Sequence, residues 1–183
     1  MKAGSNRRKS PPGRGPTNAQ AFVPLFRACR LRAKPAAGVV MAPQAGYSGT
    51  PLARKLGLKD GQRVAFAALP ETLEWLASER EFACVERADT WDGVAGDDFD
   101  YVHLFTDSAA TVDAATPALR RRIRPDGMIW VSWPKKASKV PTDVTEDTIR
   151  DRALQDILVD VKVCAVDDIW SGLKLVIRKE HRT

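Results

Sequence analysis

Two adjacent lysines, Lys135 and Lys136, are the residues of this sequence whose type and position most suggest chemistry. They follow an apolar run that ends in Trp133 and Pro134, so we expect them to stand directly after a β-strand. Two ammonium groups in that position could bind the phosphate or carboxylate of a small molecule. The alternative is a solvated surface loop, and the sequence leaves both interpretations open.

Small polar residues at two expected helix starts could bind an anion in a similar way. Hydroxyl groups and backbone N–H groups at a helix N-terminus can hold an anion, but they can also simply cap the helix. The sequence does not separate these two roles. The candidate ligand-binding residues are Ser48, Gly49, Thr50, Asp107, Ser108, Lys135 and Lys136.

Histidine and cysteine side chains form no pattern that indicates a metal site or a catalytic triad. His103 lies inside an apolar strand pattern, and the other histidine, His181, stands near the end of the sequence. A metal site needs three or four convergent ligands and a triad needs a positioned histidine, so we expect neither. We expect His103 to be a packed core residue. The three cysteines form no CxxC pair, which favours a reducing, cytoplasmic compartment.

Apolar runs and helix-start signals alternate along the chain and define the elements that would position these residues. Apolar runs of strand length predict strands, and Pro, Asp or Ser before residues at helical spacing predict helices. Their order implies a mostly parallel sheet with helices on both faces and a C-terminal antiparallel hairpin. The predicted strands cover residues 63–69, 82–87, 100–106, 128–133, 159–165 and 173–178, and the predicted helices start near Pro51, Pro70, Ser108 and Asp143.

The final strands and one turn carry a resemblance to a known class of enzymes. An antiparallel strand at the end of such a series resembles the Rossmann-like fold of S-adenosylmethionine-dependent methyltransferases. The segment Ile123–Trp130 (IRPDGMIW) is similar to the Leu-x-Pro-Gly-Gly turn that precedes the fifth strand of those enzymes. The resemblance implies an α/β, methyltransferase-like fold.

Three further segments resemble a bacterial family catalogued as domain of unknown function 3052. They are Gly46–Leu52 (GYSGTPL), Trp133–Lys136 (WPKK) and Trp170–Lys174 (WSGLK), and the resemblance extends from Gly46 to Lys179. Members of the family typically start just before the first of these segments, which implies a domain that begins near Met41. The family implies no activity that could be transferred, so it informs the fold and the boundaries only.

The loop after the first predicted strand argues against the cofactor of methyltransferases. Ligands of open α/β sheets lie at the carboxyl ends of the strands, and a cofactor needs glycines there to approach the backbone. This sequence has Leu69 and Pro70 instead, whose side chains occupy the approach, and Pro70 lacks an N–H group. Glu86 is the candidate to bind ribose hydroxyls after the second strand. We therefore expect no cofactor, and retained S-adenosylmethionine binding is the alternative.

Positive charge is concentrated at the N-terminus. Residues 1–40 hold nine of the 29 Lys and Arg residues and no acid, so the remainder holds 20 basic against 23 acidic residues. Pro, Gly, Ser, Asn and Arg dominate the first 20 residues, a composition that predicts disorder. Residues 1–40 could be a nucleic-acid-binding arm, a transit-like peptide or, as the favoured interpretation, an extension upstream of a true start at Met41. We expect one folded domain over residues 41–183.

The sequence therefore favours a cytoplasmic, methyltransferase-like binding or regulatory module for an anionic small molecule or a protein partner. Two alternatives remain: an active S-adenosylmethionine-dependent methyltransferase with a divergent cofactor loop, and nucleic-acid binding through the basic residues 1–40. No apolar run approaches the roughly 18 residues needed to span a bilayer, so we expect no membrane partner. Whether the protein is an enzyme stays open.

Overall fold

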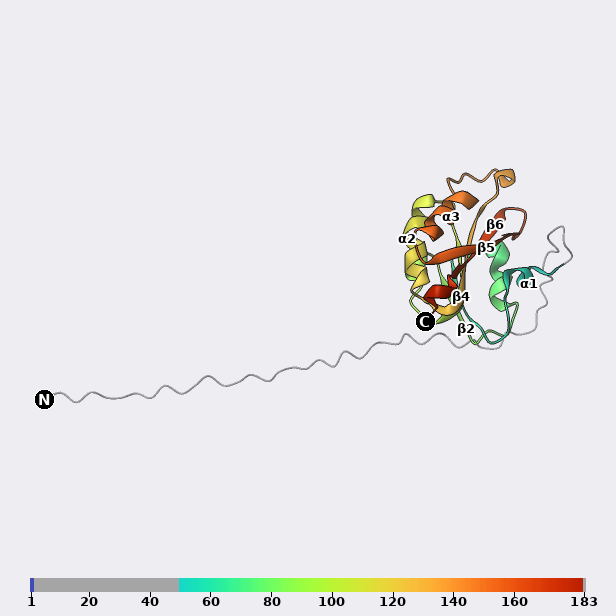
Figure 1. Cartoon of the computed structure of the whole chain (residues 1–183). Helices are drawn as coiled ribbons and strands as arrows, with labels where there is room; N and C mark the ends of the chain where they lie inside the picture. The colour runs from blue at the N-terminus through green and yellow to red at the C-terminus, as the bar shows by residue number, and fades with distance from the viewer. Residues whose placement is uncertain (2–49, 183) are drawn as a thin grey trace.

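A six-stranded β-sheet organises the part of the chain that the computed structural model describes, which is Met1 and residues 50–182 (Figure 1). The strands are β1 (Arg63–Ala67), β2 (Cys84–Ala88), β3 (Phe99–Phe105), β4 (Ile123–Pro134), β5 (Leu158–Ala165) and β6 (Trp170–Ile177). They lie in the order β2-β1-β3-β4-β6-β5. The first four in this order are parallel, whereas β6 is antiparallel to both β4 and β5.

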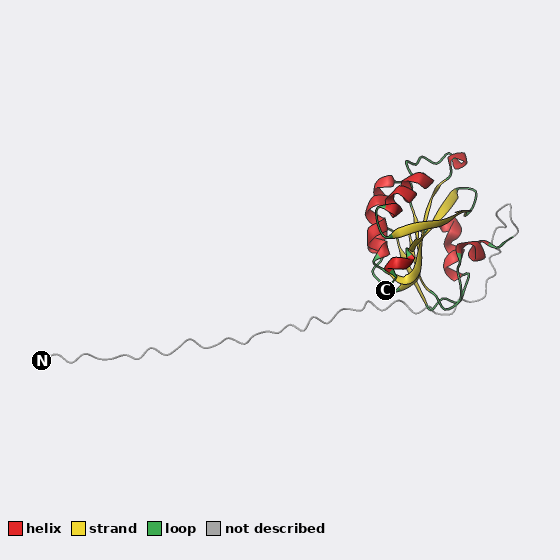
Figure 2. Ribbon diagram, viewed as in Figure 1, coloured by secondary structure: helices red, strands yellow, loops and turns green. Residues whose placement is uncertain are grey.

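Helices cover both faces of the sheet, as Figure 2 shows. The α-helices are α1 (Leu52–Leu56), α2 (Ala109–Arg120) and α3 (Glu146–Leu154), and the 3-10 helices are η1 (Glu71–Ser78), η2 (Trp91–Gly93), η3 (Lys136–Ser138) and η4 (Lys179–His181). Helices α2 and α3 pack on one face, and α1 and η1 pack on the other. The predicted fold class, a mostly parallel sheet between helices with a C-terminal antiparallel hairpin, is confirmed.

The two faces of the sheet have separate hydrophobic cores. Val131 and Leu175 are fully buried in the core beneath α2 and α3. Phe66 and Trp130 are fully buried in the core beneath α1 and η1. The indole Nε1 of Trp130 donates to the carbonyl oxygen of Leu56 over 2.9 Å, so this one side chain fixes α1 against β4.

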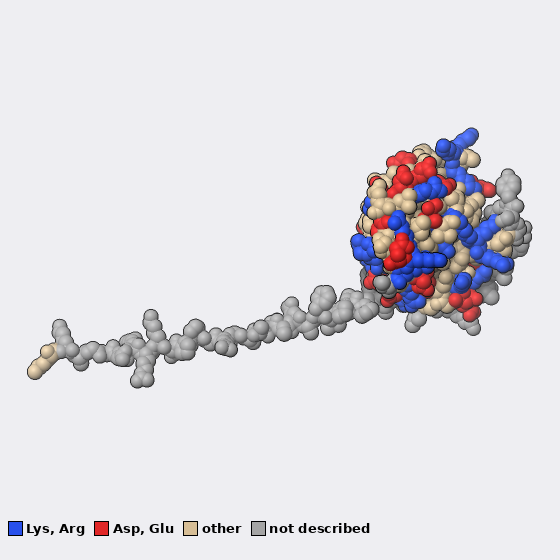
Figure 3. All heavy atoms as spheres, in the orientation of Figure 1, with Lys and Arg blue, Asp and Glu red and all other residues tan. Residues whose placement is uncertain are grey.

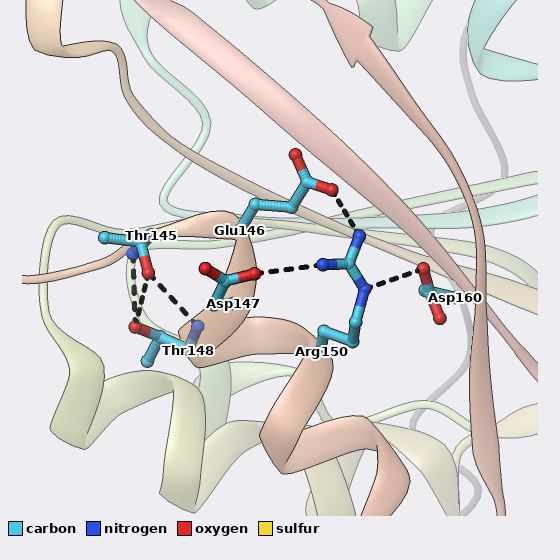
Figure 4. A network of polar contacts seen from close by, with 6 residues as sticks. All are labelled: Thr145, Glu146, Asp147, Thr148, Arg150 and Asp160. Atoms are coloured by element: carbon cyan, nitrogen blue, oxygen red, sulfur yellow. Dashed lines mark hydrogen bonds and ion pairs between the residues drawn. The ribbon is translucent and has the colours of Figure 1, made fainter.

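Helix α3 starts at a reciprocal cap that Figure 4 shows. The hydroxyl of Thr145 accepts from the N–H of Thr148, and the hydroxyl of Thr148 accepts from the N–H of Thr145. The sequence predicted that Asp143 would cap this helix, and that prediction is wrong. Asp143 Oδ1 instead accepts from the N–H of Ala109 over 2.7 Å, at the start of α2.

Arg150 ties α3 to strand β5 (Figure 4). Its guanidinium donates to Asp160 on β5 over 3.1 Å and to Asp147 over 3.0 Å, and it also pairs with Glu146. Hydrogen bonds to Asp160 and Glu146 raise the pKa of Arg150. Three carboxylates therefore share one cation on the α3 side of the sheet.

Several element boundaries differ from the predicted ones. Helix α1 begins at Leu52, so Pro51 and not Thr50 stands in its N-cap position, and Gly57 in the left-handed conformation ends the helix. Strand β2 begins two residues later than predicted. Pro117 lies inside α2 without dividing it. Proline lacks the N–H group that would donate to the carbonyl of Asp113, and Asp113 is exposed, so water can replace that donor.

The predictions for residues 2–40, Met41, Ser48 and Gly49 concern residues outside the described part of the chain, so the domain boundary at Met41 stays a prediction. Within residues 50–182, no helix combines the length and the apolar character needed to cross a membrane.

Candidate functional site at the carboxyl ends of the parallel strands

The strand order reverses next to β1, which pairs with β2 on one side and with β3 on the other. In sheets of this kind, ligands bind at the carboxyl ends of the strands near such a reversal. Four loops meet at this edge, and they follow β1, β2, β3 and β4. Their side chains and backbone donors define what the edge could bind.

The loop after β1 offers few donors to a ligand. Ala68 has a positive φ of 53°, which is unusual for a residue with a Cβ, and its N–H donates to the carbonyl oxygen of Ala88 over 2.8 Å. Leu69 packs against the core beneath η1. Pro70, which has no N–H, precedes the 3-10 helix η1. The loop therefore lacks the open, glycine-lined approach that an anionic cofactor needs.

A hollow of about 360 Å³ lies between the ends of β1 and β2. Its lining residues come from both strand ends and from η1, and an ion pair between Arg87 and Glu74 joins two of them. Both partners of this pair are partly exposed, so it is screened by solvent and adds little stability. The lining residues are Ala68, Leu69, Glu74, Arg87, Ala88 and Asp89.

Glu86, the predicted ribose-binding residue, does not line this hollow. The carboxylate of Glu86 accepts from the N–H groups of Ala95 and Gly96, over 2.5 and 3.0 Å, so it holds the next loop in place. Asp89 follows directly after β2 and lines the hollow. The apolar pattern predicted that this strand ends at Arg87, one residue before its observed end at Ala88, so Asp89 was not a predicted site residue.

The N-terminus of α2 is occupied by the chain itself. The hydroxyl of Ser108 accepts from the N–H of Thr111, which makes Ser108 the N-cap. Asp143 accepts from the N–H of Ala109, as described above. The side chain of Asp107 is exposed, and its carbonyl oxygen accepts from the loop that carries Asp143. These contacts use two of the N–H groups that a bound anion could otherwise take, those of Ala109 and Thr111.

The two lysines differ in their surroundings. Lys135 Nζ donates to the carbonyl oxygen of Asp167 over 2.5 Å, and its backbone N–H donates to Ile169 over 2.7 Å. Lys136 is exposed at the start of η3. Both follow β4 as predicted, whereas Thr50 lies beside α1 and no hydrogen bond among the described residues joins it to this edge. That these residues bind an anion stays a prediction.

A buried polar chain crosses from β3 to β4 beneath α1. The hydroxyl of Tyr101 lies 2.8 Å from His103 Nδ1, and His103 Nε2 lies 2.7 Å from the hydroxyl of Ser132. Burial lowers the pKa of His103 to about 3, so the ring is neutral, and burial raises the pKa of Tyr101. A Cβ at Gly172 would come within 2.8 Å of the Ser132 hydroxyl, which leaves no room for a ligand. His103 is a packed core residue, as predicted.

Metal chemistry finds no support in the described residues. Within residues 50–182, no three side chains of the His, Cys, Asp and Glu types lie close enough together to hold a metal ion.

Comparison with solved structures places the fold among methyltransferases. A SAM-dependent methyltransferase from Aquifex aeolicus is 14% identical, with a TM-score of 0.55 over 69% of this chain and 88% of that one. The magnesium protoporphyrin IX methyltransferase of Synechocystis PCC 6803, solved with bound SAM, is 14% identical, with a TM-score of 0.51 over 69% and 74%. At this identity the likeness establishes the fold alone.

The sequence matches no protein-family model and no curated protein. The resemblance to domain of unknown function 3052 is therefore not confirmed.

Proposed function

We propose that this protein is a non-catalytic binding module that has kept the methyltransferase fold and binds an anionic ligand. The observation that carries the proposal is that backbone N–H groups at the carboxyl edge of the sheet already donate to other residues of the chain, so they are not free to bind a cofactor. The N–H groups of Ala68, Ala109 and Thr111 each donate to another part of the chain. Ligands of such sheets bind through donors of this kind.

The residues after β1 do not fit S-adenosylmethionine. Leu69 and Pro70 occupy the approach to the strand end, and the N–H of Ala68 is paired with Ala88. A cofactor at this edge would have to break that hydrogen bond, which costs about 1 kcal/mol, and displace packed side chains. We therefore derive no methyl transfer for this chain.

The anionic character of the ligand is inferred from the basic side chains. Every ion pair among residues 50–182 uses an arginine as its cation. The lysines of the same region form none of these pairs. No carboxylate of the described residues neutralises their charge in an ion pair, so an external anion can do so.

Calorimetric titration of the full chain with S-adenosylmethionine and with S-adenosylhomocysteine tests the proposal. We expect no heat of binding for either compound. We also expect inorganic polyphosphate, as a simple polyanion, to raise the melting temperature because it binds the folded state. Micromolar binding of S-adenosylmethionine, or a melting temperature that polyphosphate leaves unchanged, would contradict the proposal.

An active methyltransferase with a divergent loop is the second candidate, and one observation favours it. Asp89 follows β2 and lines the hollow, where a carboxylate could accept hydrogen bonds from the hydroxyls of a nucleoside. If this candidate holds, S-adenosylmethionine binds and Asp89→Ala weakens that binding at least tenfold. Glu71→Ala, an exposed acid at the start of η1 that does not line the hollow, is the matched control.

A further inference from the structure

Two lysines lie side by side on the β5–β6 hairpin. Lys162 on β5 is the register partner of Lys174 on β6, and Lys174 is in turn the register partner of Trp130 on β4. All three side chains lie on the α1 side of the sheet, since Trp130 belongs to the core beneath α1. The ammonium of Lys162 stands 5.9 Å from the centre of the Trp130 ring, within range of a cation–π contact.

Other cations surround this pair. The pKa of Lys174 is lowered by burial and by the charges of Lys162 and Lys59. The pKa of the neighbouring Cys164 thiol is raised by burial, against the opposing effect of Lys162 and Lys55. Figure 3 shows Lys and Arg side chains gathered on this part of the surface, between the hairpin and α1. We call the surface formed by Lys55, Lys59, Lys162 and Lys174 the lysine face.

The positive charges of the lysine face repel one another, and no carboxylate of the described residues forms an ion pair with them. Like charges directly opposite each other on neighbouring strands are destabilising. A cluster of this kind costs stability in the unbound protein and gains it when an external anion neutralises the charges.

We propose that the lysine face binds the phosphate backbone of a nucleic acid, an assignment that rests on the proposed function and gives its anionic ligand a class and a place. The four ammonium groups come from α1, the following loop and two strands, so they spread over a surface instead of converging on one point. Such a spread suits a row of phosphates better than a single small molecule.

The predominance of lysine over arginine on this face favours a nucleic acid over an acidic protein as the partner. Interfaces between proteins are enriched in arginine and depleted of lysine, because the guanidinium forms bidentate bonds to carboxylates. In this chain the arginines already serve that purpose, as Arg150 does with three carboxylates. Lysine binds a phosphate as a point charge without a fixed geometry, which suits binding that is independent of base sequence.

The test measures the salt dependence of binding to a short, labelled DNA duplex by fluorescence anisotropy. The full chain is compared with the double variant Lys162→Gln/Lys174→Gln, and residues 1–40 are the same in both. Each lysine contact that is lost should reduce the slope of log K against log salt concentration by roughly 0.9. The matched control is Arg121→Gln/Lys139→Gln, which removes the same charge from two exposed residues that belong neither to the lysine face nor to the candidate ligand-binding residues. We expect this control to keep the slope of the unmodified chain.

Three outcomes would overturn the assignment. They are an unchanged slope in the Lys162→Gln/Lys174→Gln variant, an equal loss in the control, and tighter binding of poly-glutamate than of DNA through the same two lysines. The last outcome would assign the face to an acidic protein. Each leaves the proposed function standing, because that function fails by the binding of S-adenosylmethionine or by a melting temperature that polyphosphate leaves unchanged. Circular dichroism checks that both double variants are folded.

Discussion

Strand β5 separates two surfaces that carry charge in different ways. Asp160 points to the α3 side, where Arg150 binds it together with two further carboxylates. Lys162 points to the α1 side, where it lies beside Lys174. An irregularity in the register between Asp160 and Lys162 separates these two residues, and Val161 between them is exposed.

This difference shows which charged residues stabilise the fold and which do not. On the α3 side, opposite charges join a helix to a strand, so their removal loosens the structure. On the α1 side, equal charges lie next to each other, so their removal relieves repulsion. We infer that the first surface holds the protein together and that the second is kept for a partner.

Trp130 is expected to be the residue on which the α1 side depends most. Trp130→Ala removes a fully buried ring that contacts α1 and supports Lys162, and it should lower the free energy of unfolding by about 3–5 kcal/mol in urea denaturation. Trp130→Phe keeps a ring but loses the hydrogen bond to Leu56, and should cost less. A loss below about 1 kcal/mol for Trp130→Ala would show that α1 is held in another way.

His103 should make the α1 side sensitive to acid. Its folded pKa, about 3, lies below the ordinary value of 6.5, so below pH 6.5 the unfolded chain binds a proton that the folded chain does not. Stability is then lost as the pH falls from 6.5 towards 3, by about 1.6 kcal/mol between pH 6.5 and about pH 5. Urea denaturation at the two pH values measures this.

The variant His103→Gln should abolish most of this acid sensitivity. The exposed His181 provides the control, because His181→Gln should leave the pH dependence of unfolding in place. An equal pH dependence in His103→Gln would assign the acid sensitivity to the carboxylates instead.

The smallest expected change in stability comes from removing single charges, and the two surfaces should give changes of opposite sign. Lys174→Gln removes one of two opposed cations and should raise the free energy of unfolding by roughly 0.2–0.5 kcal/mol. Arg150→Gln should lower the melting temperature, because three carboxylates lose their shared partner. Equal signs for the two variants, measured by thermal unfolding, would remove the contrast between the faces.

Lys174 should add a second pH dependence of the free energy of unfolding, in the alkaline range. Its folded pKa lies below the ordinary 10.5, so the charged form is disfavoured in the folded state. Stability should therefore rise as the pH increases through the folded pKa towards 10.5, and this rise should be absent in Lys174→Gln.

The sequence predicted the architecture because its signals are local. Apolar runs of strand length predicted the strands, although β4 extends from Ile123 to Pro134, beyond both ends of the predicted range 128–133. His103 was assigned to the core because apolar residues surround it in the sequence. The cap at Asp143 was wrong for a different reason: a carboxylate can cap any nearby helix, and here α2 lies closer in space than α3.

The candidate site was harder to predict because its composition depends on register. Asp89 enters the hollow only when β2 ends at Ala88, one residue beyond the predicted end. Lys162 and Lys174 become neighbours only through the pairing of the hairpin, and the irregularity near Val161 shifts that pairing. A one-residue shift turns every side chain to the opposite face, so sequence spacing alone could not place these lysines together.

The position of β6 between β4 and β5 affects the order in which the strands can pair during synthesis. Strand β5 is synthesised before β6, but it lies at the edge of the sheet and pairs with β6. Until β6 leaves the ribosome, β5 has both edges open and exposes Val161 and Val163 to other chains. At roughly 5–20 residues per second, the 12 residues from the end of β5 to the end of β6 take about 0.6–2.4 s, during which a chaperone or a neighbouring nascent chain can engage the strand.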